Sequence, residues 1–127
     1  MAATPAYLEF LLEHLAPLGE ITTRRMFGGH CLYCDGAVFA LLAGNTLYLK
    51  ADAETRDIFL ARKLEQFHPF GDEQMSMNYF QPPPEFFEDP DALREWGRLA
   101  IAAGGRTKAK KKRAAKRPSI SQRSVRR

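Results

Sequence analysis

Apolar residues recur with a helical period in three stretches of the chain, and with the two-residue period of strands in the segments between them. The first helix is predicted after Thr4-Pro5, a pair that suits an N-cap and the first helical position, and it is expected to end between Pro17 and Gly19. Its inward side is formed by leucines that fall three or four residues apart: Leu8, Leu11, Leu12 and Leu15.

The second and third helices are predicted from their capping residues. Asp52 is the expected N-cap of the second helix, and Asp89-Pro90 is the clearest helix start in the chain. Gly104-Gly105 is expected to stop the third helix. The predicted inward residues of the second helix are Thr55, Ile58, Phe59 and Leu64, and those of the third are Leu93, Trp96, Ala100 and Ala103.

Short segments rich in β-forming residues lie between the first two helices, from Glu20 to Lys50, and are divided by turn pairs. Asp35-Gly36 favours a two-residue type I′ turn, and Gly44-Asn45 suits a tight turn with glycine first. Two further strands are expected around Phe67–Phe70 and Met75–Phe80. The sequence therefore predicts a two-layer α+β fold of order α-β-β-β-β-α-β-β-α, with about six mainly antiparallel strands and three helices.

The two turns also fix which side chains share a face of the sheet, because neighbours along a strand alternate between faces. The first turn is expected to pair Leu32 with Phe39, and the second to pair Leu41 with Tyr48. One predicted face holds Tyr33, Val38, Ala40, Leu42, Leu47 and Leu49, and the other holds Leu32, Phe39, Leu41 and Tyr48. Both faces are apolar, so the second needs a cover, and its four residues form a candidate interface for another copy or a partner.

The net charge of +4 conceals two parts of opposite sign. From Arg106 onward there are eleven Lys or Arg and no acid, whereas residues 1–105 hold eight bases against fifteen acids. The predicted organisation is therefore an α+β domain over residues 1–105, with charge −7, and a disordered basic tail over residues 106–127, with charge +11.

A run of bases of this kind favours nonspecific, salt-dependent binding to nucleic acid, because each base releases a condensed counterion. The alternative is a solvated tail with no dedicated partner. No aromatic residue lies among these bases, so stacking on single strands is not supported. The candidate nucleic-acid-binding residues are Arg106, Lys108, Lys110, Lys111, Lys112, Arg113, Lys116, Arg117, Arg123, Arg126 and Arg127.

The composition excludes several classes of protein. The longest apolar run, from Ala37 to Ala43, is far shorter than the roughly 18 residues that a membrane helix needs. The first residues show no signal-peptide pattern, and two cysteines do not describe a disulfide-stapled secreted domain. A cytoplasmic protein that forms an apolar core is expected.

Cys31 and Cys34 have the spacing of a redox pair or of half a zinc site, but a strand places residues three apart on opposite faces. No helix is predicted to follow them, and of the histidines only His30 is near, so they are interpreted as two small strand residues. No catalytic residues, metal or cofactor are therefore predicted. A small thiol- or metal-dependent enzyme remains the least favoured alternative.

The string Arg24-Arg25-Met26-Phe27-Gly28-Gly29 is the most unusual in the acidic part of the chain. Its paired glycines indicate a sharp turn or a close approach of something to the backbone. It matches neither of the glycine-rich nucleotide-binding motifs, so a structural bend is favoured over a ligand loop.

The same string begins a series of motifs that resembles the N-terminal domain of the TfoX/Sxy family. The motifs that follow it in order are Leu32-Tyr33, Asp35-Gly36, Phe39-Ala40, Leu47-Tyr48-Leu49-Lys50, Met75-Ser76-Met77-Asn78-Tyr79 and Trp96. The resemblance implies a two-layer α+β fold, no catalytic activity and a role in regulating natural transformation competence with the cyclic-AMP receptor protein. The full-length regulators carry a second, helical domain where this chain has its basic tail.

Together these observations predict a non-enzymatic bacterial regulatory or adaptor domain whose tail attaches it to nucleic acid. Its partners would be nucleic acid, a transcription factor by family resemblance, and a second copy of the chain through the sheet. The alternative is an interaction or dimerisation module with an idle tail.

Overall fold

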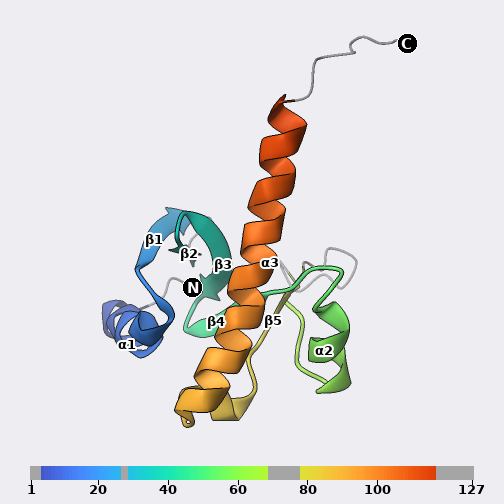
Figure 1. Cartoon of the computed structure of the whole chain (residues 1–127). Helices are drawn as coiled ribbons and strands as arrows, with labels where there is room; N and C mark the ends of the chain where they lie inside the picture. The colour runs from blue at the N-terminus through green and yellow to red at the C-terminus, as the bar shows by residue number, and fades with distance from the viewer. Residues whose placement is uncertain (1–3, 27–28, 69–77, 117–127) are drawn as a thin grey trace, which may run out of the picture.

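The computed structural model of the chain describes residues 4–26, 29–68 and 78–116. Within them, five antiparallel strands form one sheet in the order β1-β2-β3-β4-β5, accompanied by three α-helices (Figure 1). The elements are α1 (Pro5–Leu15), η1 (Ala16–Leu18), β1 (Ile21–Met26), β2 (Gly29–Cys34), β3 (Ala37–Ala43), β4 (Thr46–Lys50), α2 (Arg56–Ala61), β5 (Tyr79–Phe80), η4 (Pro84–Phe87) and α3 (Pro90–Lys116). The predicted α+β class and order of elements are confirmed.

In the described residues the sheet has five strands, close to the predicted six, and next to the predicted strand at Phe67 the chain forms a bridge. Gln66 pairs with Phe80 in an isolated antiparallel bridge, and β5 itself holds two residues, Tyr79 and Phe80. Backbone hydrogen bonds from Phe67 to Tyr79 and from Gln81 to Glu65 hold the bridging segment beside β5. The remainder of the two predicted strands, residues 69–77, lies outside the described residues.

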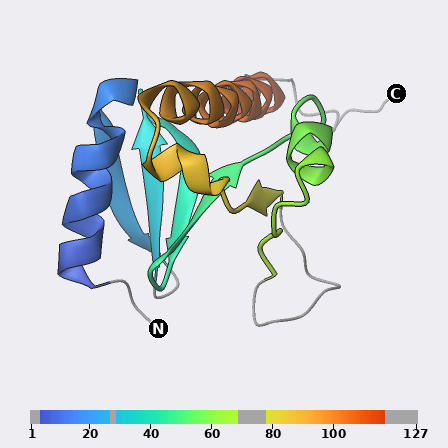
Figure 2. The ribbon, with the colours of Figure 1, turned by 90° about the horizontal axis from the view of Figure 1, so that it is seen from below.

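Helices α1 and α3 cover the same face of the sheet (Figure 2). Thr4 caps α1 by accepting a hydrogen bond from the Tyr7 amide, and Pro5 occupies the first turn, as the sequence predicts. Leu11 and Leu15 of α1 are fully buried, whereas Leu8 and Leu12 are half-buried. Asp89 begins α3 by accepting a hydrogen bond from the Asp91 amide at 2.9 Å.

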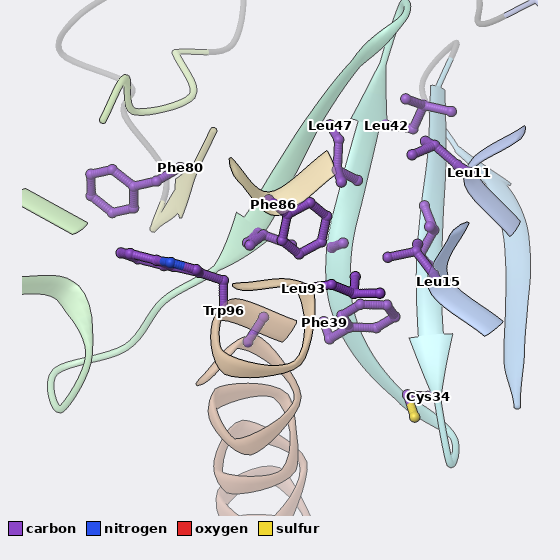
Figure 3. Close-up of a cluster of buried hydrophobic side chains, with 14 of the residues drawn as sticks. Leu11, Leu15, Cys34, Phe39, Leu42, Leu47, Phe80, Phe86, Leu93 and Trp96 are labelled. Carbon is purple, nitrogen blue, oxygen red and sulfur yellow. The ribbon is translucent and has the colours of Figure 1, made fainter. Parts of the chain in front are cut away.

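The core lies between this face of the sheet and the two helices (Figure 3). Phe39, Phe59, Phe80 and Phe86 are fully buried. Phe59 of α2 stands 5.2 Å from both the Phe80 and the Trp96 rings, measured between centroids, so one aromatic group joins α2, β5 and α3. The predicted inward residues of α3 are all buried: Leu93, Trp96, Ala100 and Ala103.

Both predicted hairpin turns form, but a bulge in β3 changes the predicted faces. Positive φ angles of 53° at Asp35 and 80° at Gly36 fit the type I′ turn. Leu32 pairs with Ala40 instead of Phe39, because the register shifts by one residue beyond the pairing of Tyr33 with Val38. An extra residue in one strand reverses the alternation that follows it, so Phe39 and Ala40 are both buried.

Helix α2 begins later than predicted. Its N-cap is Thr55, and Asp52 instead closes the preceding turn, accepting hydrogen bonds from the Glu54 and Thr55 amides. Thr55 and Phe59 are buried as expected, and Leu64 packs against the core. Ile58 is 42% exposed, so its predicted inward orientation is wrong. The short helix buries one side, marked by Thr55 and Phe59 four residues apart, and Ile58 falls on its outer side.

The predicted end of α3 at Gly104-Gly105 is also wrong, because the helix continues to Lys116. Gly104 is buried where α3 crosses β3, and a Cβ on it would overlap the carbonyl oxygen of Val38 and lie 3.1 Å from the carbonyl carbon. Gly105 has nothing within 4 Å of its Cβ position. The first glycine therefore permits a close crossing and does not terminate the helix.

Candidate nucleic-acid interface

The last three turns of α3, residues 106–116, are called the basic end here. They contain only Lys, Arg, Ala and one Thr. In Figure 1 this part of the helix extends beyond the sheet, and Lys108, Ala109, Lys110, Lys111 and Lys112 are all exposed. The structure thus places seven predicted nucleic-acid-binding residues on a helix, four of them classed as exposed, and the expectation of a disordered tail is wrong for residues 106–116.

The helical state of the basic end has three physical causes. Ala, Lys and Arg have high intrinsic helix propensity, and bases suit the negative end of the helix dipole. The costly step of helix formation is nucleation, which the packed half of α3, from Pro90 to Gly105, has already provided. Repulsion among the lysines opposes propagation, but it acts on exposed side chains that salt screens.

Arg106 attaches the start of the basic end to the turn before α2. Its Nε donates to Asp52 Oδ2 at 2.6 Å and lies 3.0 Å from Glu54 Oε2, and its Nη2 donates to Asp52 Oδ1 at 3.0 Å. The Arg106 hydrogen bond is the main cause that lowers the pKa of Asp52 from an ordinary 3.8 to about 2. Arg106 is therefore engaged with the acidic part of the molecule, and its assignment as a nucleic-acid ligand stays a prediction.

Lys111 of the basic end acts on Lys50, the last residue of β4. The pKa of Lys50, at the end of β4, is lowered first by burial and then by repulsion from Lys111. Lys50 Nζ donates to the Tyr79 hydroxyl at 3.3 Å and lies 4.8 Å from the centroid of its ring. Burial raises the pKa of Tyr79 to about 12, so this hydroxyl keeps its proton at neutral pH.

The other predicted tail residues are Arg113, Lys116 and four that follow them. Arg113 and Lys116 belong to the helical backbone of the basic end. Four more candidates lie outside the described residues: Arg117, Arg123, Arg126 and Arg127. The candidates whose side chains are described as exposed are Lys108, Lys110, Lys111 and Lys112.

Cys31 and Cys34 lie on opposite faces of β2, as the strand geometry predicts. Cys34 faces the core, with its Sγ 3.3 Å from the Cβ position of Gly19, whereas Cys31 lies opposite Leu41 on the other face. Burial is the main cause that raises the pKa of both thiols, which leaves them protonated at neutral pH. Among the described residues, no group of three or more His, Cys, Asp or Glu is placed to hold a metal ion.

The arginine and glycine string begins on the edge strand β1. Arg24 lies opposite Cys31 and Arg25 opposite His30, so the two arginines point to different faces. Gly29, the first residue of β2, pairs with Met26, and a Cβ on it would overlap the carbonyl oxygen of Leu42. The close approach predicted from the glycines is thus made by β3 at Gly29. Phe27 and Gly28 are outside the described residues.

The four-residue candidate interface is divided by the bulge in β3. Leu32 and Phe39 are fully buried in the core, so the prediction is wrong for them. Leu41 and Tyr48 lie on the opposite face as a cross-strand pair, and the Tyr48 ring stands 4.8 Å from the Phe67 ring, measured between centroids. Half of the predicted apolar patch therefore belongs to the core, and one of the other two side chains is partly covered by Phe67.

The fold and the projecting helix define a class: a small α+β domain built on one antiparallel meander, which carries its helices on one face and extends the last helix as a basic rod. The chain belongs to the TfoX N-terminal domain family, whose model matches residues 13–104. This is a family of regulatory domains that is linked to competence for DNA uptake and is not known for enzymatic activity.

The family match ends at Gly104, so the basic end lies beyond the matched residues. No match was found among curated proteins. In the described part of the chain, none of the helices has the length and apolar character needed to cross a membrane.

Proposed function

We propose that this chain is a regulatory adaptor domain whose basic end attaches it to nucleic acid without sequence preference. The observation that carries the proposal is the run of exposed lysines on the projecting part of α3: Lys108, Lys110, Lys111 and Lys112. Such side chains release counterions from phosphates, which gives affinity that depends on salt and not on sequence. Contacts made by the acidic α+β domain would then supply the regulatory role.

The membership of a family linked to competence for DNA uptake supports the regulatory half of the proposal. The separation of charge supports the other half, since an acidic domain of charge −7 is repelled by nucleic acid and needs a basic attachment to remain near it.

Replacing Lys108, Lys110, Lys111 and Lys112 with Gln tests the proposal. Glutamine preserves the helix while removing the charge. Binding of the full chain to a fluorescent 20-base-pair duplex of mixed sequence is measured by anisotropy over a range of salt concentrations. The expected result is an affinity about 100-fold lower at low salt, with the slope of log K against log salt reduced by about 3.

A matched control removes four charges from elsewhere: Arg56→Gln, Lys63→Gln, Arg94→Gln and Arg98→Gln. These side chains also lie on or beside helices, but away from the basic end. The control is expected to change the affinity less than about threefold. Equal losses in the two variants would show that net charge alone drives binding, and no loss in the first variant would refute the proposal.

A further inference from the structure

We infer that the basic end binds duplex DNA as a preformed helix lying in the major groove, an inference that rests on the proposed attachment to nucleic acid. The alternative within that proposal is a loose chain of charges that associates with any polyanion. The two modes use the same residues. They differ in whether the affinity for DNA depends on the helical form of the basic end and on an accessible major groove.

The first observation is that residues 108–112 of the basic end have exposed side chains, although Lys108 lies beside Gly36 and the preceding Arg106 is held by Asp52. Residues 108–112 are five consecutive exposed positions, and successive residues of an α-helix turn by about 100°. Five positions therefore sample the whole circumference. This part of the helix is a cylinder about 10–12 Å across with its side chains, and the major groove of B-form DNA is about 12 Å wide.

The second observation is the chemistry around that cylinder. Lysines occupy four of the five positions, with Ala109 between them, so positive charge faces in several directions at once. A helix in the major groove has a phosphate backbone on each flank, and lysines on both of its sides reach both strands. A flat surface would instead be contacted by only one side of the helix.

The chemistry also favours the B-form duplex over other nucleic acids. The basic end contains no aromatic residue on which unpaired bases could stack. The major groove of an A-form RNA duplex is too deep and narrow to admit a helix. Lysine is a point charge without the planar fork that reads guanine, so little sequence preference is expected.

The third observation is that the helix is held in a defined direction. Gly104 is seated against the Val38 carbonyl, and two residues later Arg106 contacts Asp52 and Glu54. The basic end leaves the domain from these two fixed points as a rod of about 16 Å. Because the rod points away from the sheet (Figure 1), it can enter a groove while the acidic domain remains outside.

The test compares four probes of one sequence with the full-length chain: a 20-base-pair DNA duplex, the same duplex with glucosylated hydroxymethylcytosine filling its major groove, the RNA duplex and single-stranded DNA. Plain duplex DNA is expected to bind about tenfold more tightly than each of the others. Distamycin, which occupies the minor groove, is expected to leave the affinity unchanged. Equal affinity for the plain, glucosylated and RNA duplexes would overturn the inference.

A second variant separates the helix from its charges. Ala109→Gly, Ala114→Gly and Ala115→Gly together weaken the helix while retaining every base. Circular dichroism should show the loss of helix, and the tenfold preference for plain duplex DNA should disappear while the salt slope remains. The matched control places Gln at the same three positions, which keeps the helix and is expected to keep the preference.

These measurements distinguish failure of the inference from failure of the proposed function. A glycine variant that retains the preference for plain duplex DNA refutes binding as a preformed helix. If the lysine variant described above binds as well as the natural chain does, the attachment itself is refuted. If the lysine variant binds weakly but the natural chain treats all four probes alike, attachment stands and only the groove mode fails.

Discussion

Gly104 and Gly105 are adjacent in sequence, but only Gly104 lies where a side chain cannot fit. A Cβ at Gly104 would overlap the carbonyl oxygen of Val38, whereas the Cβ position of Gly105 is open. Gly104→Ala is expected to lower the free energy of unfolding by about 1–3 kcal/mol, because backbone atoms of β3 cannot yield to it. Gly105→Ala should raise it by about 0.5–1 kcal/mol, through better helix propensity. Urea denaturation measures both.

The two alanine variants control for each other, since each adds one methyl group to the same helix. If both stabilised the protein, α3 would not cross β3 as closely as described. If both destabilised it, the helix would not run through Gly105.

Asp52 gives stability that depends on pH. Its pKa in the folded protein is lowered to about 2, below the ordinary 3.8, so its charge stabilises the fold at neutral pH, and that contribution is lost as the pH falls from about 4 to 2. Asp52→Asn retains an oxygen for the turn but loses the ion pair with Arg106. The variant should be about 1–2 kcal/mol less stable at pH 7, with the difference disappearing near pH 2.

Asp57→Asn provides the comparison, because Asp57 is an exposed acid in the first turn of α2. It is expected to change stability by less than about 0.5 kcal/mol at every pH. Thermal unfolding from pH 2 to 7 measures the two curves. A constant difference between Asp52→Asn and the natural chain across this range would contradict the role given to the charge.

At the scale of elements, the sequence predicts best where the determinants are local. The type I′ turn predicted at Asp35-Gly36 requires positive φ angles, and both residues have them. Thr4 and Asp89 cap the helices that they are predicted to cap. No residue near Phe39 in the sequence signals the bulge. It arises from packing Phe39 and Ala40 against the same core, which depends on helices far away in the sequence.

The length of α3 escapes prediction for a related reason. A glycine pair after a buried stripe normally indicates a C-cap, and only the crossing with β3 shows that Gly104 serves another purpose. The basic run then resembles a separate tail, since its composition alone indicates disorder. Its helical state depends on continuity with the packed half of α3, which is a property of the whole element.

The cap of α3 provides a prediction for this element. Asp89→Ala removes the oxygen that accepts a hydrogen bond from the Asp91 amide, and it should cost about 1 kcal/mol of stability. Glu88→Ala is the control, because Glu88 directly precedes the cap. Chemical denaturation of both variants checks the difference, and equal stabilities would show that Asp89 does not cap the helix.

At the scale of the whole molecule, α3 runs from the acidic domain into the basic end, so charges of opposite sign meet where the helix leaves the domain. Asp35 is an acid close to the basic end, because the Cβ position of its neighbour Gly36 is 2.9 Å from Lys108 Nζ. Asp35→Asn should tighten binding to duplex DNA about twofold at low salt and have no effect near 0.5 M, since salt screens the charge. Asparagine also tolerates the positive φ of 53° at this position.

The comparison variant is Glu9→Gln, which removes an equal charge from α1, away from the basic end in Figure 1. It should leave the affinity unchanged. A twofold effect that persisted at high salt would point to a structural change in the turn instead of electrostatics.

The candidate site can be predicted from sequence only in part. The lysines of the basic end are evident from composition, because a run of bases without an acid indicates an interaction with polyanions wherever it lies in the fold. The contact between Arg106 and Asp52 cannot be predicted, since the two residues are 54 positions apart and nothing local to either indicates the other. That contact distinguishes a base that attaches the rod to the domain from bases that are free to bind.

Because α3 is one continuous helix, a partner bound at the C-terminal end of the helix meets the domain at a fixed orientation. Because the rise and the rotation per residue of an α-helix are fixed, the rod sets both the distance of the domain from the bound partner and the side of the domain that faces it. Inserting residues beyond Arg106 would lengthen the rod by about 1.5 Å each and swing the domain by about 100° each. Two added residues would turn its opposite side toward a partner, whereas seven would return nearly the same side at a greater distance.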